Sequence, residues 1–417
     1  MQKREFLRTM GGATLSAVFG PELLSYYGSL PKEVLAEDER FWAEIRGKYR
    51  LTSDYINLEN GYFSMQASPV LEGFIARVRE INLEGAHYMR TRMPDDKLRV
   101  RARLARMAGC STDELVITRN TTESLDTVIA GFDWKPGDGA VMAEQDYGAM
   151  RDMFKLQAAR YGMVNATISV PNHPRSDDEL VQLYANAITP KTRLLMVCHV
   201  VNITGQVMPV TKIADMAHAR GVDVMVDGAH AFAQLAYNIP DLRVDYYGAS
   251  LHKWLGAPLG AGILYVRKDK VAKLWPIYGD FTVADTDIRK LNHTGTHPSH
   301  TDLGIDHAMD FHDAVGIQRK EARLRYLQHY WTSKIRHLPK VTLNTPADPH
   351  RTCAIANVGI EGMTPSELAR QLLDRFQVYT VAINTPTVQG ARVTPHMFTT
   401  TKELDALVRG LKELAGS

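Results

Sequence analysis

Short apolar runs alternate with amphipathic stretches from about residue 113 to residue 266. Several of these runs are continuously apolar rather than alternating, a pattern typical of strands buried on both faces. The runs that predict strands are ELVIT (114–118), GAVMAE (139–144), NATISV (165–170), RLLMVCHV (193–200), VDVMVD (222–227), VDYYGAS (244–250) and GAGILYV (260–266).

The stretches between these runs have helical spacing. TTESLDTVIAGF places Leu125, Val128, Ile129 and Phe132 on one face, and PVTKIADMAHARG begins with proline and stops at Gly221. Strands that alternate with helices predict an α/β domain in which helices cover a mostly parallel sheet.

The pattern changes after this region. The polar stretch 281–312, rich in histidine and glycine, predicts a loop, and a long charged helix is expected over 313–337, followed by a strand–helix–strand–helix tail. We interpret 51–300 as a large α/β domain and 310–417 as a smaller α+β domain. Residues 31–50 are expected to pack on the smaller domain as a helix.

Composition restricts the class of protein. The chain has 417 residues, of which 45% are hydrophobic and 23% charged, and its net charge of +2 gives no field that would favour nucleic acid. No run approaches the roughly 18 apolar residues that a membrane span needs. Three scattered cysteines, Cys110, Cys198 and Cys353, predict neither a disulfide framework nor a zinc knuckle. We therefore expect neither a nucleic-acid partner nor a membrane span.

The first 30 residues differ from the rest. MQKREFLRTMGGATLSAVFG has a basic start and then a short, weakly apolar run, and KREFL resembles a relaxed twin-arginine export motif in which Lys3 replaces the first arginine. A functional signal would place the protein in the periplasm. The alternative is an amphipathic helix of a cytoplasmic protein.

A strand end followed by hydroxyl residues is the first candidate for chemistry. In TRNTTESL (118–125) a helix is expected to begin at Thr121 and Thr122. Free N–H groups and the helix dipole make such a position an anion site. Simple N-capping by threonine is the structural alternative.

A carboxylate follows a second strand. In VMVDGAHA (224–231), Asp227 comes directly after a buried strand and His230 follows three residues later. The carboxyl edge of a parallel sheet is where α/β proteins bind ligands. Asp-Gly is also an ordinary turn, which is the structural alternative.

A lysine follows a third strand in SLHKWLGAPLGAG. The glycines after Lys253 are no dinucleotide fingerprint, because the strand ILYV follows them instead of a helix. A lysine amine of lowered pKa can form a Schiff base with a carbonyl. An anion-binding helix start, the strand-end Asp227 and Lys253, in this order, fit the phosphate, the ring nitrogen and the aldehyde of pyridoxal phosphate.

With these residues in place, the chain resembles the class V aminotransferases over roughly 55–410, most densely in DGAHA and SLHKWLGAPLGAG. Within that family it looks similar to the isopenicillin N epimerase-like and cysteine desulfurase-like branches. The resemblance implies fold type I of the pyridoxal-phosphate-dependent transferases, in which a large domain with a mostly parallel seven-stranded sheet is joined to a small C-terminal α+β domain. It also implies the cofactor, pyridoxal 5'-phosphate.

The resemblance further implies roles for single residues. Lys253 would carry the cofactor as a Schiff base, Asp227 would pair with its ring nitrogen, and His230 would lie near its ring hydroxyl. Tyr147, in EQDYGAM, would cover the ring face, and Asn202, in HVVNITG, would reach the ring or its hydroxyl. The phosphate would be held by Thr121, Thr122, Ser250 and His252.

Other segments resemble the family's substrate side. Gly295 and Thr296, in NHTGTHP, would complete the phosphate site from a second subunit, which implies a homodimer with shared active sites. Arg392, in ARVTPHMF, would bind the substrate carboxylate with its planar guanidinium. Asn60, in NLENGYF, would belong to a substrate-side loop, with a plain turn as the alternative.

The sequence also bears on two other kinds of site, a metal site and a persulfide-forming cysteine. The histidines at 293, 297 and 300 are separated by Gly295 and Pro298, which deny them a common helix face, so no metal is expected. A persulfide-forming desulfurase needs a cysteine ahead of its carboxylate-binding arginine. The stretch 376–396, which includes Arg392, has no cysteine, and this argues against that activity.

The expected reaction begins with a Schiff base between an amino acid and the cofactor, from which Lys253 as general base generates a carbanion. Transamination, epimerisation and C–S lysis share this path, so the sequence predicts an aminotransferase or an epimerase, with a C–S lyase acting on a cysteine derivative as the alternative. A non-catalytic relative that only binds the cofactor would have no need for Lys253, Asp227 and Arg392 together.

Overall fold

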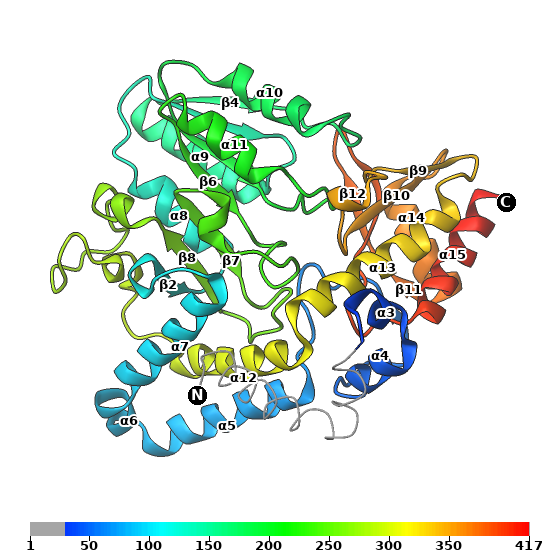
Figure 1. The fold of residues 1–417 in the computed structure, drawn as a ribbon, viewed down its shortest axis with the longest axis horizontal. Helices are drawn as coiled ribbons and strands as arrows, with labels where there is room; N and C mark the ends of the chain where they lie inside the picture. The colour runs from blue at the N-terminus through cyan, green and yellow to red at the C-terminus, as the bar shows by residue number, and fades with distance from the viewer. Residues whose placement is uncertain (1–29, 417) are drawn as a thin grey trace.

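The computed structural model describes residues 30–416, which form two lobes side by side (Figure 1). The larger lobe contains a seven-stranded sheet in the order β2-β8-β7-β6-β5-β3-β4, in which β8 runs antiparallel to both neighbours and the other strands are parallel. Its strands are β2 (Leu115–Thr118), β3 (Gly139–Ala143), β4 (Val164–Ile168), β5 (Thr192–Cys198), β6 (Asp223–Asp227), β7 (Tyr246–Ser250) and β8 (Gly262–Val266). This confirms the predicted α/β fold class.

The central strands are buried on both faces, as their apolar runs predicted. Alternate residues of β3 enter two different cores, Val141 and Ala143 one of them and Ala140 and Met142 the other. Helices fill both layers because parallel strands need crossover connections. The helices that follow strands in this lobe are α8 (Thr121–Gly131), α9 (Gly148–Tyr161), α10 (Asp177–Ala187) and α11 (Val210–His218).

The smaller lobe is built on an antiparallel four-stranded sheet in the order β12-β13-β10-β9. Its elements are β9 (Val341–Leu343), β10 (Ala356–Ile360), α14 (Pro365–Phe376), β12 (Val381–Asn384), β13 (Gln389–Val393) and α15 (Thr401–Ala415). The tail therefore has more strands than the sequence predicted, because β9, β12 and the others are too short to stand out from turns. The N-terminal strand β1 (Ile56–Asn57) pairs in parallel with β11 (Val378–Tyr379), so an early segment crosses to this lobe.

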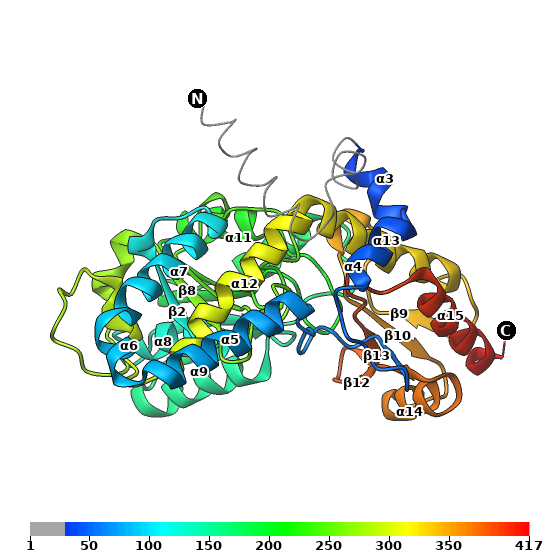
Figure 2. The same cartoon turned by 90° about the horizontal axis from the view of Figure 1, so that it is seen from below.

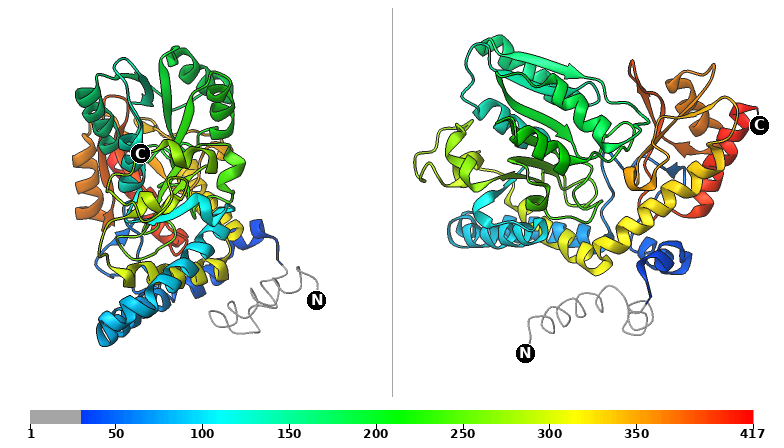
Figure 3. Two further views of the ribbon diagram at one scale, coloured as in Figure 1. Left: turned by 90° about the vertical axis from the view of Figure 1, so that its left-hand side faces the viewer. Right: turned by 45° about the horizontal axis from the view of Figure 1, so that its top comes forward.

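Two consecutive helices, α12 (Ser299–Val315) and α13 (Ile317–Ile335), run from under the large sheet to the small lobe (Figure 3). The loop prediction for 281–312 is therefore wrong from residue 299 onward. One of the polar side chains that suggested a loop, Asp306, is buried and accepts hydrogen bonds from Arg99 and Arg103. The charged helix begins later than predicted because Gly316, with φ of 84°, separates it from α12.

N-terminal helices flank both lobes (Figure 2). Arg323 of α13 donates to Ala36 O, and Arg46 forms a bidentate ion pair with Glu403 of α15, which ties the early helices to the small lobe. The helices of this part are α3 (Lys32–Glu37), α4 (Glu39–Arg46), α5 (Ser68–Glu84), α6 (Ala86–Thr91) and α7 (Met93–Ala108). Short 3-10 helices are η1 (Thr112–Glu114), η2 (Ile239–Leu242), η3 (Lys268–Lys273), η4 (Ile288–Asn292) and η5 (Pro349–Arg351).

Among residues 30–416, none of the helices combines the length and apolar character needed to cross a membrane. The twin-arginine-like segment falls almost entirely within residues 1–29, outside the described residues, so the export hypothesis stays a prediction.

The loop after β5 approaches the small lobe at a glycine, which gives a stability test. Gly205 has φ of +76°, and a Cβ placed there would lie 1.9 Å from the carbonyl oxygen of Ile355. Gly221 has a similar φ of +72° but no atom within 4 Å of such a Cβ. We expect Gly221→Ala to lower the free energy of unfolding by about 1–2 kcal/mol through the left-handed backbone alone. Gly205→Ala should cost at least about 3 kcal/mol because steric overlap adds to it. Urea denaturation of both variants measures the difference, and equal losses would contradict this reading of the contact.

Candidate functional site

A cavity of about 210 Å³ lies between the carboxyl edge of the large sheet, the segment after β1 and strand β13. Most of the residues singled out in the sequence meet in it. The lining residues are Gly61, Tyr62, Asn120, Thr121, Thr122, Tyr147, Met150, Asn202, Asp227, Ala229, His230, Ser250, His252, Lys253 and Arg392.

The parallel strands bring these residues together. Asp227 is the last residue of β6 and Ser250 is the last residue of β7, the neighbouring parallel strand. Thr121 begins the helix that follows β2, and Asn202 follows β5. Because parallel strands end at the same edge of a sheet, positions far apart in the chain converge there.

The start of α8 is arranged as an anion site. Asn120, and not a threonine, caps the helix, because its side chain accepts from the backbone N–H of Glu123 at 2.9 Å. Simple capping by threonine is therefore wrong. The hydroxyl of Ser250 accepts the N–H of Thr121 at 2.8 Å and lies 2.7 Å from the Thr121 hydroxyl. The N–H of Thr122 lies in the first turn, where a helix offers no internal acceptor, so it is available to an anion.

Lys253 lines the cavity, and its amine has a lowered pKa. Desolvation lowers the pKa of its amine to about 8, with the positive charge of Arg392 acting in the same direction and the carboxylate of Asp227 opposing it. Burial raises the pKa of Asp227, while Lys253 and the N–H of Ala229, 2.9 Å from Oδ1, favour its charged form. A lysine with a pKa near 8 has a usable fraction of neutral amine at neutral pH.

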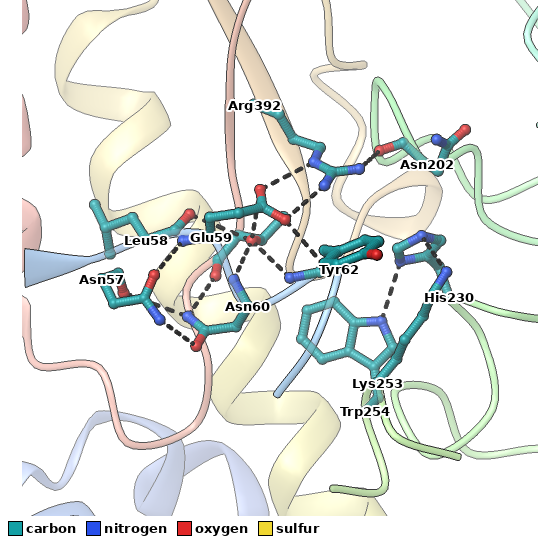
Figure 4. A network of polar contacts seen from close by, with 12 residues as sticks. Asn57, Leu58, Glu59, Asn60, Tyr62, Asn202, His230, Lys253, Trp254 and Arg392 are labelled. Carbon is teal, nitrogen blue, oxygen red and sulfur yellow. Dashed lines mark hydrogen bonds and ion pairs between the residues drawn. The ribbon is translucent and has the colours of Figure 1, made fainter. Parts of the chain in front are cut away.

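His230 connects this lysine to Trp254. Nε2 of His230 lies 3.2 Å from Nζ of Lys253, and the indole N–H of Trp254 donates to Nδ1 of His230 at 3.3 Å (Figure 4). An indole nitrogen only donates, so Nδ1 must accept and the proton of the neutral ring sits on Nε2, facing the lysine. Desolvation, together with the charges of Lys253 and Arg392, holds the pKa of His230 well below its usual range.

Trp254 was not singled out in the sequence. It is fully buried and stacks on His396, with ring centroids 5.8 Å apart and planes 10° apart. The only sequence signal was its position directly after the lysine.

The predicted carboxylate-binding arginine already has an ion-pair partner. Arg392 donates through Nε and Nη2 to the two oxygens of Glu59, at 3.1 and 2.5 Å, and through Nη1 to the carbonyl oxygen of Asn202 at 3.1 Å (Figure 4). Sequence reasoning missed Glu59 because nothing local to NLENGYF indicates an arginine 333 residues away.

Asn60, predicted on the substrate side, does not line the cavity. Its amide donates to the carbonyl oxygens of Thr394 at 2.9 Å and Asn57 at 3.3 Å, which anchors the segment, while the following Gly61 and Tyr62 face the cavity. The plain-turn alternative describes its side chain better.

Gly295 and Thr296 also lie outside this cavity. Their loop is held by His297, whose Nε2 lies 3.0 Å from Nζ of Lys97 and 3.0 Å from the carboxylate of Asp302. Within residues 30–416, no three histidine, cysteine, aspartate or glutamate residues gather in a way that could hold a metal ion.

The cavity suits the groups of pyridoxal phosphate. Two buried polar atoms that belong to lining residues, Asn202 Oδ1 and His252 Nδ1, have no hydrogen-bond partner among residues 30–416. Buried polar atoms normally have partners, so a polar ligand is expected to supply them. The hydroxyls and N–H groups at Thr121, Thr122 and Ser250 match a phosphate, and Asp227 matches a protonated ring nitrogen.

Comparisons with known proteins agree with this geometry. Residues 72–409 match the family model described as Aminotransferase class-V. The isopenicillin N epimerase of Amycolatopsis lactamdurans is 29% identical over 393 residues, which cover 90% of this chain and 98% of that protein. A cysteine desulfurase of Haloferax volcanii is 30% identical over 263 residues, 60% of this chain and 61% of that protein.

Solved structures share the fold. A cystine C–S lyase in complex with cysteine persulfide superimposes with a TM-score of 0.79 at 22% identity, covering 86% of this chain and 97% of that chain. These matches confirm the predicted family and fold class, and they confirm pyridoxal phosphate as the cofactor of the family.

The lowered pKa of Lys253 can be measured in the cofactor-free protein. Its acylation rate should rise as pH increases through about 8, because desolvation favours the neutral amine; exposed lysines should respond only above about 10. Asp227→Asn removes the charge that raises this pKa, so its midpoint should move to lower pH. Mass spectrometry of acetylated peptides gives the profile, and a midpoint above 10 in the wild type would contradict the assigned environment.

The proton position on His230 gives a second test. Trp254→Phe removes the donor to Nδ1, and an unsatisfied buried acceptor costs about 1–3 kcal/mol. We expect a mixture of the two neutral forms of His230, visible in the ¹⁵N shifts of histidine-labelled protein. Trp331→Phe is the matched control, because Trp331 is equally buried but its indole N–H has no partner among the described residues. An unchanged His230 in Trp254→Phe would show that the indole does not set the proton position.

Proposed function

The chain belongs to the class V aminotransferase family, and on that premise we propose that it is a pyridoxal-phosphate-dependent enzyme that removes the α-proton of an amino acid. The proposed outcome is transamination or epimerisation. One observation carries the proposal: an amine of lowered pKa, Lys253, shares a single cavity with an anion-binding helix end, the strand-end carboxylate of Asp227 and the guanidinium of Arg392.

The chain's residues divide the work of holding the cofactor. Thr121, Thr122, Ser250 and His252 would hold the phosphate, Asp227 the ring nitrogen and Lys253 the aldehyde carbon. Tyr147 and Asn202, also in the cavity wall, would contact the ring. When bound, the cofactor supplies the electron sink that makes the α-proton of an amino acid acidic.

Lys253 is the proposed general base. Its neutral Nζ would accept the α-proton of a bound amino acid, and the lowered pKa keeps that nitrogen unprotonated often enough to act. His230 lies against the same nitrogen and is held neutral, so it adds no positive charge that would resist the protonation of Lys253. Arg392 would orient the substrate through its carboxylate.

The cysteines argue against persulfide-forming desulfuration. The chain has three, none of which lines the cavity: Cys198 and Cys353 are buried, and Cys110 lies at the end of α7. Burial raises the pKa of all three thiols, which disfavours the reactive thiolate. A C–S lyase that eliminates from a cysteine derivative needs no such thiol, so it remains the competing outcome in the assays below.

A homodimer with shared sites belongs to the same proposal. Gly295 and Thr296 lie on a loop outside this chain's own cavity, so they would reach a bound phosphate only in the site of a second copy.

The first experiment is the visible absorbance spectrum of the purified protein beside Lys253→Ala. The wild type should show the band of a lysine-bound cofactor, and the variant should lose or shift it. A wild type that gains no band when supplied with pyridoxal phosphate would overturn the proposed function.

The reaction can then be assigned in D₂O. Incubation with single amino acids should place deuterium at the α-carbon of the substrate, and chiral chromatography and 2-oxo acid analysis separate epimerisation from transamination. Release of sulfide or pyruvate from cysteine derivatives would assign the lyase instead. A bound cofactor with no α-exchange on any amino acid would point to a non-catalytic relative.

A further inference from the structure

Glu59 accounts for much of the hydrogen bonding of the Arg392 guanidinium. Of its five N–H groups, two donate to the Glu59 carboxylate and one donates to the carbonyl oxygen of Asn202. Both side chains of the pair are nearly buried, at 9% exposure for Arg392 and 4% for Glu59. Among residues 30–416, the N–H groups of Arg392 without a partner are therefore one on each terminal nitrogen, and Arg392 is one of the residues that line the cavity.

Two N–H groups on adjacent terminal nitrogens make a fork that fits one carboxylate. Glu59 occupies the Nε side of the guanidinium and Asn202 O holds Nη1, so the plane of the guanidinium is restrained before any substrate arrives. This restraint matters because a substrate whose carboxylate is held in the wrong place also has its α-proton too far from the base that removes it.

Glu59 is itself held by its surroundings. Its Oε1 accepts the backbone N–H of Tyr62 at 2.9 Å, and its Oε2 lies 3.5 Å from the hydroxyl of Thr394. The same hydroxyl accepts the N–H groups of Asn60 and Gly61, at 2.7 and 3.0 Å. These hydrogen bonds hold the segment after β1 against Thr394, the residue that follows β13. Glu59 is the charged residue of this segment.

We propose that Glu59 is the positioning residue for the carboxylate-binding arginine, which it orients through both carboxylate oxygens and whose positive charge it offsets. This rests on the proposed function, in which Arg392 receives the α-carboxylate of an amino acid. Glu59 does not touch the substrate: it sets the orientation of Arg392 and offsets its charge.

The second half of the proposal follows from the charges around Lys253. Arg392 lines the same cavity as Lys253 and is paired through two of its N–H groups with Glu59. The positive charge of Arg392 lowers the pKa of this lysine, and the negative charge of Glu59 raises it. Removing the charge of Glu59 leaves Arg392 uncompensated, so the lysine should lose its proton at lower pH. A merely structural ion pair would hold the segment together without moving that midpoint.

The chain offers a matched control. Arg46 and Glu403 form a second bidentate pair, at 3.0 and 2.8 Å, which also joins an N-terminal element to the small lobe but lines no part of this cavity. Glu403 also belongs to the capping box of α15, a role that glutamine can fill. Glu403→Gln therefore reports the loss of a similar ion pair without a change at the site.

The experiment compares Glu59→Gln, Glu59→Asp and Glu403→Gln, each loaded with pyridoxal phosphate, and each also without cofactor for Lys253 labelling. Glu59→Gln should lower kcat for the best amino acid about tenfold or more, since misplacing the carboxylate costs the proton transfer. KM should not rise, because the site gains positive charge towards a carboxylate. The labelling midpoint of Lys253 should fall by about half a pH unit.

Glu59→Asp separates position from charge. It keeps the carboxylate but is one methylene shorter, so kcat should fall while the Lys253 midpoint stays near the wild-type value; this variant also provides the test if the glutamine variant does not fold. Glu403→Gln should change neither quantity. Wild-type kcat and an unmoved midpoint in Glu59→Gln would overturn this inference and leave the proposed function standing. The proposed function itself fails if the wild type binds no cofactor, or binds it and exchanges no α-proton.

Discussion

The site depends on one constraint: parallel strands of a single sheet end at the same edge. Because β6 and β7 are neighbouring parallel strands, the carboxylate of Asp227 and the hydroxyl of Ser250 lie at the same edge of the sheet and line one cavity. The antiparallel β8 then lets β2 join the sheet from its far side, so that Thr121 meets Ser250 at hydrogen-bond distance across 129 residues of chain. The start of α8, the carboxylate of Asp227 and the amine of Lys253 therefore line one cavity at this edge.

The small lobe contributes one side of the cavity at the edge of the large sheet. Arg392 comes from β13 of the small sheet and Glu59 from the segment that crosses to that sheet after β1. Arg392 lines the cavity together with Lys253, and Glu59, its ion-pair partner, lies outside the lining (Figure 4). Burying two charges is costly unless geometry and hydrogen bonds compensate, and here both carboxylate oxygens and three N–H groups find partners.

The ionisable groups around Lys253 carry little uncompensated charge. Desolvation pushes Lys253 and His230 toward neutrality, and Asp227 retains a charge partner in the lysine. A neutral amine beside a neutral imidazole is a suitable base for a carbon acid. The indole N–H of Trp254 donates to Nδ1 of His230 and so gives the imidazole one defined proton position.

The sequence by itself determined the strands and the family. Short continuous apolar runs that alternate with helical patterns indicate strands buried on both faces. Asp227, Ser250 and Lys253 are recognisable as candidates because each lies at the end of such a strand or within a few residues of it. Helix α12 was not recognisable in the sequence, because its aspartates and histidines are typical of a solvent-exposed loop. The arginine partner of its Asp306 comes from α7, which is distant in the sequence.

Only the tertiary structure decided which distant side chains meet. Glu59 and Arg392 lie 333 residues apart, and His230 and Trp254 face each other only because the loops after β6 and β7 pack together. Such pairs leave no periodic signal, since a hydrogen bond depends on the direction of two side chains and not on their spacing in sequence. Most of the candidate site residues were therefore visible in the sequence, whereas the contacts that orient them exist only in the folded chain.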